Sequence, residues 1–302
     1  MGDQHLIRRG EGAREPFALE VTPESAGALC RPGPGTPAVW AHAGLKILVL
    51  AAGESAMFTT GDDEALVLSL AGSAEVEVDG KPFTLHGRAD VWSGPSDVVY
   101  APTGSTVVVT SDQGGRFAVP TARATARLEP SYLPAGDVPV ELRGAGQASR
   151  QVNNFGVPGV LEADRIIACE VLTPGGNWSS YPPHKHDEER DGETRLEEIY
   201  YFEVADGPQG TQGVGYQRVY GHEAAEIDIL AEVRDGDTVL IPHGWHGPSM
   251  AAPGYDLYYL NVMAGPGEER AWLICDDPDH GWVRETWADQ TIDPRLPFGG
   301  QR

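Results

Sequence analysis

The sequence is poor in cysteine and in basic residues, and both shortages exclude whole classes of protein. Its three cysteines, Cys30, Cys169 and Cys275, lack the CxxC spacing of a zinc ribbon. An odd, scattered set argues against a disulfide framework and favours a reducing compartment. Lysine and arginine number 22 against 45 aspartates and glutamates, a formal net charge of −23. We therefore expect no nucleic-acid partner and no anionic membrane partner, because both require a basic face.

Long apolar runs and the common nucleotide-binding motifs are missing as well. No run reaches the roughly 18 apolar residues of a membrane-spanning helix, and the first residues lack the apolar stretch of a secretory signal. The sequence has no GxxxxGK[ST] loop, no GxSxG elbow and no GxGxxG after a strand. We therefore expect a cytoplasmic protein that is not a nucleotide-dependent enzyme or a serine hydrolase of these classes.

Glycine, proline and short strand-like runs are what the sequence does contain. Its 38 glycines and 24 prolines make up about a fifth of the chain, and Asp79-Gly80 is typical of a hairpin turn. Helices are expected only at 23–29 and 266–273. Many short strands without long helices predict an all-β fold of sandwich or small-barrel type. The predicted strands are 45–51, 65–70, 74–78, 98–101, 106–110, 165–172, 198–204, 215–220, 226–229, 238–241 and 256–262.

The chain divides into two related halves. Its length suits two domains, and a segment rich in proline and glycine at 130–146 separates them, so we predict domains at 1–145 and 146–302. Asp, Val, Pro and Gly recur at one offset, since 237 − 97 = 140 and 244 − 104 = 140. This repeat predicts tandem β-barrels. Where the second half has His246, the first has Thr106, so we expect the first barrel to bind no metal.

The histidines point to a metal site in the second half. His184 and His186 flank Lys185, and on an extended segment residues i and i+2 face the same side. Two neighbouring imidazoles on one face favour a divalent metal, although an HxH pair also occurs on ordinary surfaces. Glu198 begins a strand-like run, and His246 follows a Pro-His-Gly-Trp turn on a later strand.

Together these residues form the ligand layout of a cupin, with three histidines and one glutamate. Cupins usually place the glutamate four or five positions after the second histidine, which here is Arg190 or Asp191. Arginine cannot bind a metal, and Asp191 lies in a charged, glycine-containing stretch typical of a loop. We therefore prefer Glu198, with Glu197 on the opposite face of its strand. The predicted ligands are His184, His186, Glu198 and His246.

Several segments of the second half are distinctive. They are GNWSSYPPHKHD at 176–187, LEEIYY at 196–201, QRVY at 217–220, YYLNVMAGP at 258–266 and DPDHGW at 277–282. Through these segments the chain resembles the 5-deoxy-glucuronate isomerases of inositol catabolism, which are related to the 5-keto-4-deoxyuronate isomerases of pectin breakdown. The resemblance spans essentially the whole chain, is strongest between residues 165 and 285, and implies a tandem cupin fold.

This resemblance implies an aldose–ketose isomerase. The substrate would be 5-deoxy-glucuronate, an anionic sugar acid, and the product 2-deoxy-5-keto-gluconate. A divalent ion, Zn(II) first and Mn(II) or Fe(II) as alternatives, would polarise the carbonyl and stabilise an enediolate. A metal-assisted hydride shift is the competing mechanism, and the sequence does not separate the two.

The catalytic base and the cation that binds the substrate carboxylate are identified by no motif. Strand placement makes Glu203, His222 and Tyr258 candidate bases. Arg218 and Lys185 are the candidate cations, and we prefer Arg218 because Lys185 alternates away from the ligand face.

Three alternatives remain open at this stage. The same four ligands suit a cupin oxygenase, or a ketol-isomerase acting on another uronic acid. A sugar-binding bicupin without activity is the third, but the complete ligand set and the lack of a helix-turn-helix pattern speak against a regulator. The sequence leaves homo-oligomerisation open.

Overall fold

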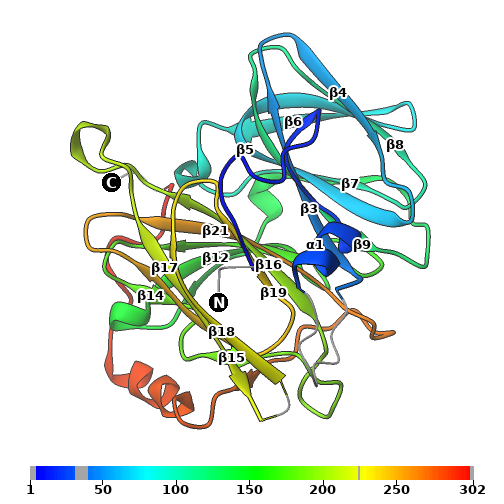
Figure 1. Ribbon diagram of the computed structural model, residues 1–302. Coiled ribbons are helices and arrows are strands. Elements are labelled where there is room, and N and C mark those ends of the chain that lie inside the picture. Colours follow the sequence, from blue (N-terminus) through cyan, green and yellow to red (C-terminus); the bar gives the residue numbers. More distant parts are fainter. Residues whose placement is uncertain (1–4, 31–39, 224, 300–302) are drawn as a thin grey trace.

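Three β-sheets contain nearly all of the regular structure (Figure 1). A computed structural model of the chain describes residues 5–30, 40–223 and 225–299. A nine-stranded sheet forms the N-terminal barrel. Its strands are β2 (Phe17–Val21), β3 (Ala43–Leu50), β4 (Glu54–Thr59), β5 (Asp63–Val78), β6 (Lys81–Arg88), β7 (Val98–Ala101), β8 (Thr106–Ser111), β9 (Gly115–Arg123) and β10 (Ser131–Leu133).

The C-terminal barrel is made of two sheets that face each other. The larger has seven strands in the order β1 (Leu6–Ile7), β19 (Thr238–Ile241), β16 (Glu197–Val204), β21 (Leu257–Ala264), β13 (Ile167–Thr173), β12 (Arg150–Gly156) and β11 (Val140–Arg143). The smaller has six strands, namely β18 (Ala225–Val233), β17 (Gly215–His222), β20 (Trp245–Ala251), β15 (His184–Lys185), β22 (Cys275–Asp276) and β14 (Trp178–Ser179). The expected all-β fold with few short helices is confirmed.

The helices are short. The α-helix α1 (Pro23–Leu29) lies where it was predicted, because Thr22 and Ser25 cap its first turn reciprocally and Pro23 occupies the first helical position. The 3₁₀ helices are η1 (Val91–Ser93), η2 (Ala135–Asp137), η3 (Gly146–Ala148), η4 (Pro208–Gly210) and η5 (Gly281–Asp289).

The second predicted helix, at 266–273, is wrong. This segment is irregular because it is fixed by tertiary contacts rather than by its own hydrogen bonds. The Arg270 guanidinium donates hydrogen bonds of 2.6 Å to the carbonyl oxygens of Gly156, Leu161 and Ile166. Such a contact with residues more than a hundred positions away leaves no local pattern in the sequence.

Hydrophobic side chains form three cores, one inside each barrel and one between them. The seven-stranded sheet is buried on both faces: one face packs against the small C-terminal sheet, and the other packs against the N-terminal barrel. Along β16, Tyr200 and Phe202 face the C-terminal barrel, whereas Ile199 and Tyr201 face the N-terminal one. The interior of the N-terminal barrel is apolar, with Phe58, Val76 and Phe117 among its members.

The predicted strands at 65–70 and 74–78 are one strand, β5, that bends at Gly72. Its register with β6 shifts there. Gly72 has φ +94°, and a Cβ would lie 2.6 Å from the Gly114 carbonyl oxygen. Only glycine fits this close approach, so the bend lets one strand pair with both halves of the N-terminal barrel. The Asp79-Gly80 hairpin turn that follows is confirmed by its positive φ angles.

Two short strands of the N-terminal half, β1 and β11, belong to the seven-stranded C-terminal sheet. We predicted the division between residues 145 and 146, but β11 already pairs with β12 of the C-terminal sheet. The N-terminal β1 also joins that sheet, beside β19. The strands that carry the internal repeat, β7 and β19, hold corresponding places, since each pairs with a long central strand, β5 and β16.

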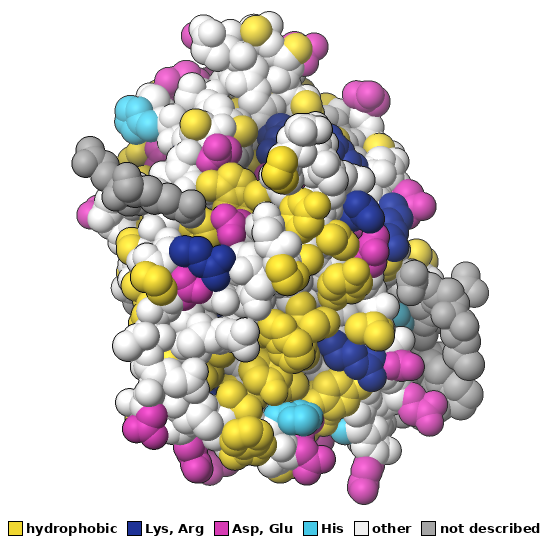
Figure 2. All heavy atoms as spheres, turned by 90° about the vertical axis from the view of Figure 1, so that its left-hand side faces the viewer, with side chains coloured by type: hydrophobic (Ala, Val, Ile, Leu, Met, Phe, Trp, Pro, Cys, Tyr) yellow, Lys and Arg dark blue, Asp and Glu magenta, His cyan; other side chains and the backbone are white. Residues whose placement is uncertain are grey.

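Acidic side chains are dispersed over one face of the molecule. Figure 2 shows them spread around one face, with few lysine and arginine side chains between them and hydrophobic side chains along the middle. The charge of −23 is therefore not a single acidic patch on this face. No helix of the described residues is long and apolar enough to cross a membrane.

A buried ion pair joins the barrels. Glu170 on β13 accepts hydrogen bonds from both terminal nitrogens of Arg88 on β6. It also accepts bonds from Tyr258 Oη at 2.8 Å and Asn153 Nδ2 at 3.0 Å. The Arg88 and Glu170 side chains are 3% and 1% exposed. Neither charge is solvated, so each depends on the other.

Replacing Glu170 with alanine should destabilise the protein strongly, because Arg88 would remain buried without its partner. We expect the free energy of unfolding in urea to fall by about 3–5 kcal/mol. Asp62→Ala is the matched control, since it breaks the exposed pair between Asp62 and Arg123, and a loss below about 1 kcal/mol is expected there. Equal effects of the two substitutions would contradict the structural role of the buried pair.

Candidate metal centre

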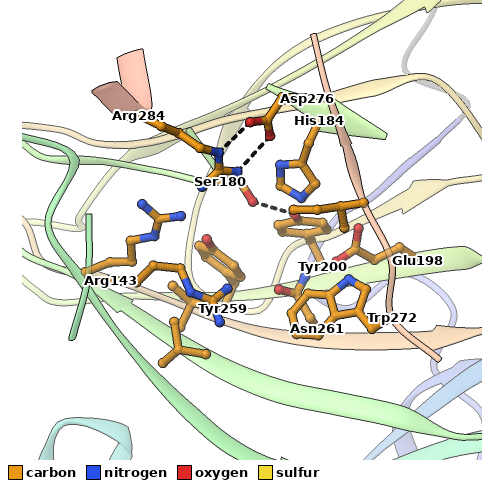
Figure 3. Close-up of a pocket in the computed structure, with 14 residues that line it drawn as sticks. Arg143, Ser180, His184, Glu198, Tyr200, Tyr259, Asn261, Trp272, Asp276 and Arg284 are labelled. Atoms are coloured by element: carbon orange, nitrogen blue, oxygen red, sulfur yellow. Dashed lines mark hydrogen bonds and ion pairs between the residues drawn. The ribbon is translucent and has the colours of Figure 1, made fainter. Parts of the chain in front are cut away.

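Four side chains meet inside the C-terminal barrel. Three of them lie on strands, and the fourth directly follows a strand. His184 lies on β15 and pairs in register with His246 on β20. His186 follows β15, and Glu198 is the second residue of β16. Figure 3 shows His184 and Glu198 at the same cavity. The structure therefore brings together all four residues that the sequence predicted as ligands.

The ligand atoms are close and almost completely buried. One potential ligand atom each from His186, Glu198 and His246 lies within 4.8 Å of the others. Glu198 Oε2 is 3.2 Å from His186 Nε2 and 3.0 Å from His246 Nε2. The ring centroid of His184 is 4.5 Å from that of His246. None of the four residues is more than 8% exposed.

The backbone fixes the orientation of all three imidazoles. Each Nδ1 faces a carbonyl oxygen, that of Pro182 at 3.3 Å, Leu196 at 3.3 Å or Gly244 at 3.2 Å. A carbonyl oxygen only accepts, so Nδ1 carries a proton, and in the neutral ring Nε2 presents a lone pair. Lone pairs of Nε2 facing a carboxylate oxygen repel unless a cation lies between them. The donor set therefore fits a divalent metal.

The electrostatics of the cluster are consistent with ligands that can coordinate. Burial and the imidazoles of His246 and His186 lower the pKa of His184 well below 6.5. Burial opposes ionisation of Glu198, but His246 and His186 outweigh it and lower the pKa of Glu198 to about 2. Burial lowers the pKa of His186, but the Glu198 carboxylate outweighs burial and raises that pKa above 6.5. A metal ion binds the ionised carboxylate and the neutral form of each imidazole, so its binding would displace any proton from His186.

A glycine lets the histidine strands approach each other. Gly247 has φ +100°, and a Cβ there would lie 1.8 Å from the Ser180 carbonyl oxygen. The residue next to His246 must therefore be glycine for β20 to pass the segment that leads into His184.

The two cations predicted for the substrate lie elsewhere. Lys185 points away from the ligand face, and its Nζ lies 2.7–2.9 Å from carboxylate oxygens of Asp187, Glu188 and Glu193. Arg218 is held by the Ile229 carbonyl at 2.9 Å and by Asp228. Neither is among the described residues that line the cavity, because each already has local partners.

The three candidate bases are also outside the cavity lining among the described residues. Glu203 faces the N-terminal barrel and forms two hydrogen bonds with Arg116, at 2.8 and 2.9 Å. Tyr258 donates to Glu170 in the core between the barrels. His222 Nε2 lies 2.8 Å from Asp187 Oδ2. The catalytic roles expected of Glu203 and Tyr258 do not fit, because both occupy the outer face of the seven-stranded sheet.

A cavity of about 410 Å³ is lined by two of the proposed ligands, His184 and Glu198. In Figure 3 Arg143 and Glu198 lie on opposite sides of it, with Tyr259 and Tyr200 between them. Residues that the sequence analysis missed supply most of its polar lining, namely Arg143, Arg150, Ser180, Tyr200, Tyr259, Asn261, Trp272, Asp276 and Arg284. Strand alternation could have identified Tyr259 and Asn261, whereas the others depend on tertiary packing.

Two donors in this lining have no protein partner. Asn261 Nδ2 and Trp272 Nε1 are buried and form no hydrogen bond within the described residues. Buried donors are normally satisfied, so both indicate that a polar ligand or water completes the cavity.

Comparisons with known proteins identify related sequences. A family model described as the KduI/IolB family matches residues 22–283. The chain is 39% identical over 271 residues to a 5-deoxy-glucuronate isomerase of Geobacillus kaustophilus, covering 89% of this chain and 91% of that protein. It is 37% identical over 249 residues to one of Listeria monocytogenes, covering 81% and 88%.

Solved structures show the same fold. The crystal structure of an IolB-like protein from Salmonella typhimurium matches with a TM-score of 0.80 and 31% identity, over 92% of this chain and 98% of that one. The oxalate decarboxylase of Lactobacillus farciminis matches with a TM-score of 0.57 at 13% identity, over 85% and 82%. The second likeness concerns the fold alone and is consistent with a cupin barrel.

The double variant His184→Ala, His186→Ala should lose its bound metal, because two of the four ligands are removed. We expect the metal content of the purified protein, measured by inductively coupled plasma mass spectrometry, to fall from one equivalent to background. His86→Ala, which changes an exposed histidine of the N-terminal barrel, should retain the metal. Full retention in the double variant would contradict the assignment of the site.

Proposed function

Because the chain belongs to the KduI/IolB family, we propose that it is a 5-deoxy-glucuronate isomerase. It would convert 5-deoxy-glucuronate, an aldehyde at C1 and a carboxylate at C6, to 2-deoxy-5-keto-gluconate in inositol catabolism. The observation that carries the proposal is the buried cluster of His186, Glu198 and His246, which His184 joins through its contact with His246, beside a cavity. Three free cysteines suit a reducing cytoplasm.

One divalent ion would occupy the cluster, held by His184, His186, Glu198 and His246. Three imidazole nitrogens and one carboxylate favour Zn(II), while Mn(II) and Fe(II) are also compatible with this ligand set. When bound, the ion supplies a Lewis acid that polarises the C1 carbonyl and the C2 hydroxyl. The Asn261 amide and the Trp272 indole would donate hydrogen bonds to oxygens of the sugar.

The proton transfer requires a base, and we assign it to Asp276. Of the described residues that line the cavity, only Glu198 and Asp276 carry a carboxylate, and Glu198 is committed to the imidazoles. Asp276 on β22 lies opposite His184 on β15, so its position relative to the ligands is fixed by strand pairing. Arg284 Nη2 holds Asp276 Oδ1 at 2.7 Å (Figure 3). The carboxylate would take the proton from C2 and return it to C1, while the proton of the C2 hydroxyl passes to the C1 oxygen.

The purified protein should isomerise 5-deoxy-glucuronate without oxygen, because the reaction redistributes electrons within the substrate. We expect the ketose to form at the same rate in anaerobic and aerated buffer, monitored by nuclear magnetic resonance. Chelation of the metal should abolish the reaction, and adding Zn(II) should restore it. Turnover that consumes oxygen would instead identify an oxygenase.

Replacing Asp276 with asparagine should slow the chemical step, because the amide cannot accept the C2 proton. We expect kcat to fall by about 100-fold or more, with the metal retained. Asp279→Asn, an exposed aspartate of the same segment, is the control and should leave kcat unchanged. An unchanged kcat in Asp276→Asn would exclude Asp276 as the base and favour a hydride shift.

A further inference from the structure

Arg150 is a buried guanidinium that has no carboxylate partner in the described part of the chain. It lies at the start of β12, is 5% exposed and lines the cavity. Within residues 5–30, 40–223 and 225–299, no ion pair involves it. Its Nη1 donates to the carbonyl oxygens of Ala148 at 3.1 Å and Tyr181 at 3.3 Å. A buried charge normally has a partner of opposite sign, so this one points to a partner that comes from outside the chain.

The two neighbouring arginines, Arg143 and Arg284, each have a carboxylate partner. Arg143 donates to Glu141 through Nε at 3.0 Å and Nη2 at 2.6 Å. Arg284 is paired with Asp276. Burial, together with the positive charges of Arg143 and Arg284, lowers the pKa of Arg150 to about 10. Among the described residues that line the cavity, Arg150 is therefore the arginine whose positive charge no carboxylate neutralises. This single charge matches a ligand with one negative charge.

The surroundings of Arg150 hold its guanidinium in place without neutralising it. The group lies over the Trp287 ring, 5.6 Å from its centroid, and Arg284 lies over the same ring at 5.2 Å. The bond to the Tyr181 carbonyl links Arg150 to the segment that leads into His184. A planar donor fixed by stacking and by carbonyls is preorganised for a carboxylate.

We propose that Arg150 binds the carboxylate of the substrate and makes the enzyme select sugar acids over neutral sugars. The inference rests on the proposed function, because the aldehyde end must lie at the metal ligands for the other end to reach Arg150. The single charge favours a monoanionic carboxylate over a phosphate ester, whose second charge would meet no unpaired cation among the described residues that line the cavity. Arg150 takes the role that the sequence analysis gave to Arg218.

The test compares binding of two probes that cannot be isomerised. One is the acid obtained by reducing the aldehyde of 5-deoxy-glucuronate to an alcohol, and the other is its neutral carboxamide. By isothermal titration calorimetry, the wild-type protein should bind the acid about 10- to 100-fold more tightly than the amide, as expected for a charge-assisted hydrogen bond. Arg150→Met should remove this preference by weakening the acid alone.

Arg218→Met is the matched control, since Arg218 is a partly exposed arginine of the same barrel outside the cavity lining. It should leave the preference unchanged. Arg150→Met should keep its metal and melt at a temperature equal to or above that of the wild type, because an unpaired buried charge is removed. Arg150→Lys retains the positive charge but lacks the planar pair of N–H donors of the guanidinium, so it should recover part of the preference.

The outcomes separate this inference from the proposed function. If the wild type fails to isomerise the sugar but prefers the acid through Arg150, the carboxylate site stands and the reaction must be reassigned. If the wild type isomerises the sugar and Arg150→Met still prefers the acid, the assignment of Arg150 is overturned. Equal loss of affinity for acid and amide would also overturn it, because that pattern indicates a general change in cavity shape.

Discussion

The burial of three carboxylates on one strand is the constraint on which the site depends. All eight residues of β16 are buried, and three of them are Glu197, Glu198 and Glu203. Buried carboxylates need partners, and successive side chains of a strand point to opposite faces. Glu197 accepts from three backbone N–H groups, those of Ala41, His42 and Ala43, at 2.7–3.0 Å. Glu203 pairs with Arg116, which leaves Glu198 alone on the inner face.

This division explains why the N-terminal barrel matters although its own interior is apolar. By satisfying Glu197 and Glu203, it fixes both ends of β16 from outside. The register of β16 is then fixed, because a shift by one residue would exchange its two faces and turn Glu198 away from the imidazoles. The Arg88–Glu170 pair secures β13 in the same way. The N-terminal barrel thus acts as a support for the metal centre, which requires rigid ligand geometry.

The sequence was informative wherever the deciding contacts are local or repeated. His184 and His186 follow the two-residue period of a strand, and the internal repeat located the strand before His246. Glu198 was found because a strand-like run follows it, although the distance from His186 is atypical. Lys185 and Arg218 were expected to bind the substrate because they lie near the motif. The structure instead pairs each of them with a carboxylate that is close by in the sequence. Arg150 and Asp276 could not be found in this way, because nothing in their neighbouring residues reveals which sheet face or cavity they reach.

The overall charge of the chain and the charge of its site follow different physics. Most acidic side chains of the described residues are at least partly exposed, and at the surface ions screen interactions beyond roughly 8 Å at physiological salt. A guanidinium that is 5% exposed acts through a medium of low dielectric constant, where its attraction for a carboxylate is several times stronger than in water. An acidic protein can therefore bind an acidic sugar, provided that one cation is buried beside the cavity and has no acidic partner among the described residues. The cost of keeping Arg150 unpaired in the free protein is recovered when an anion enters, so the same burial that destabilises the empty cavity supplies its selectivity.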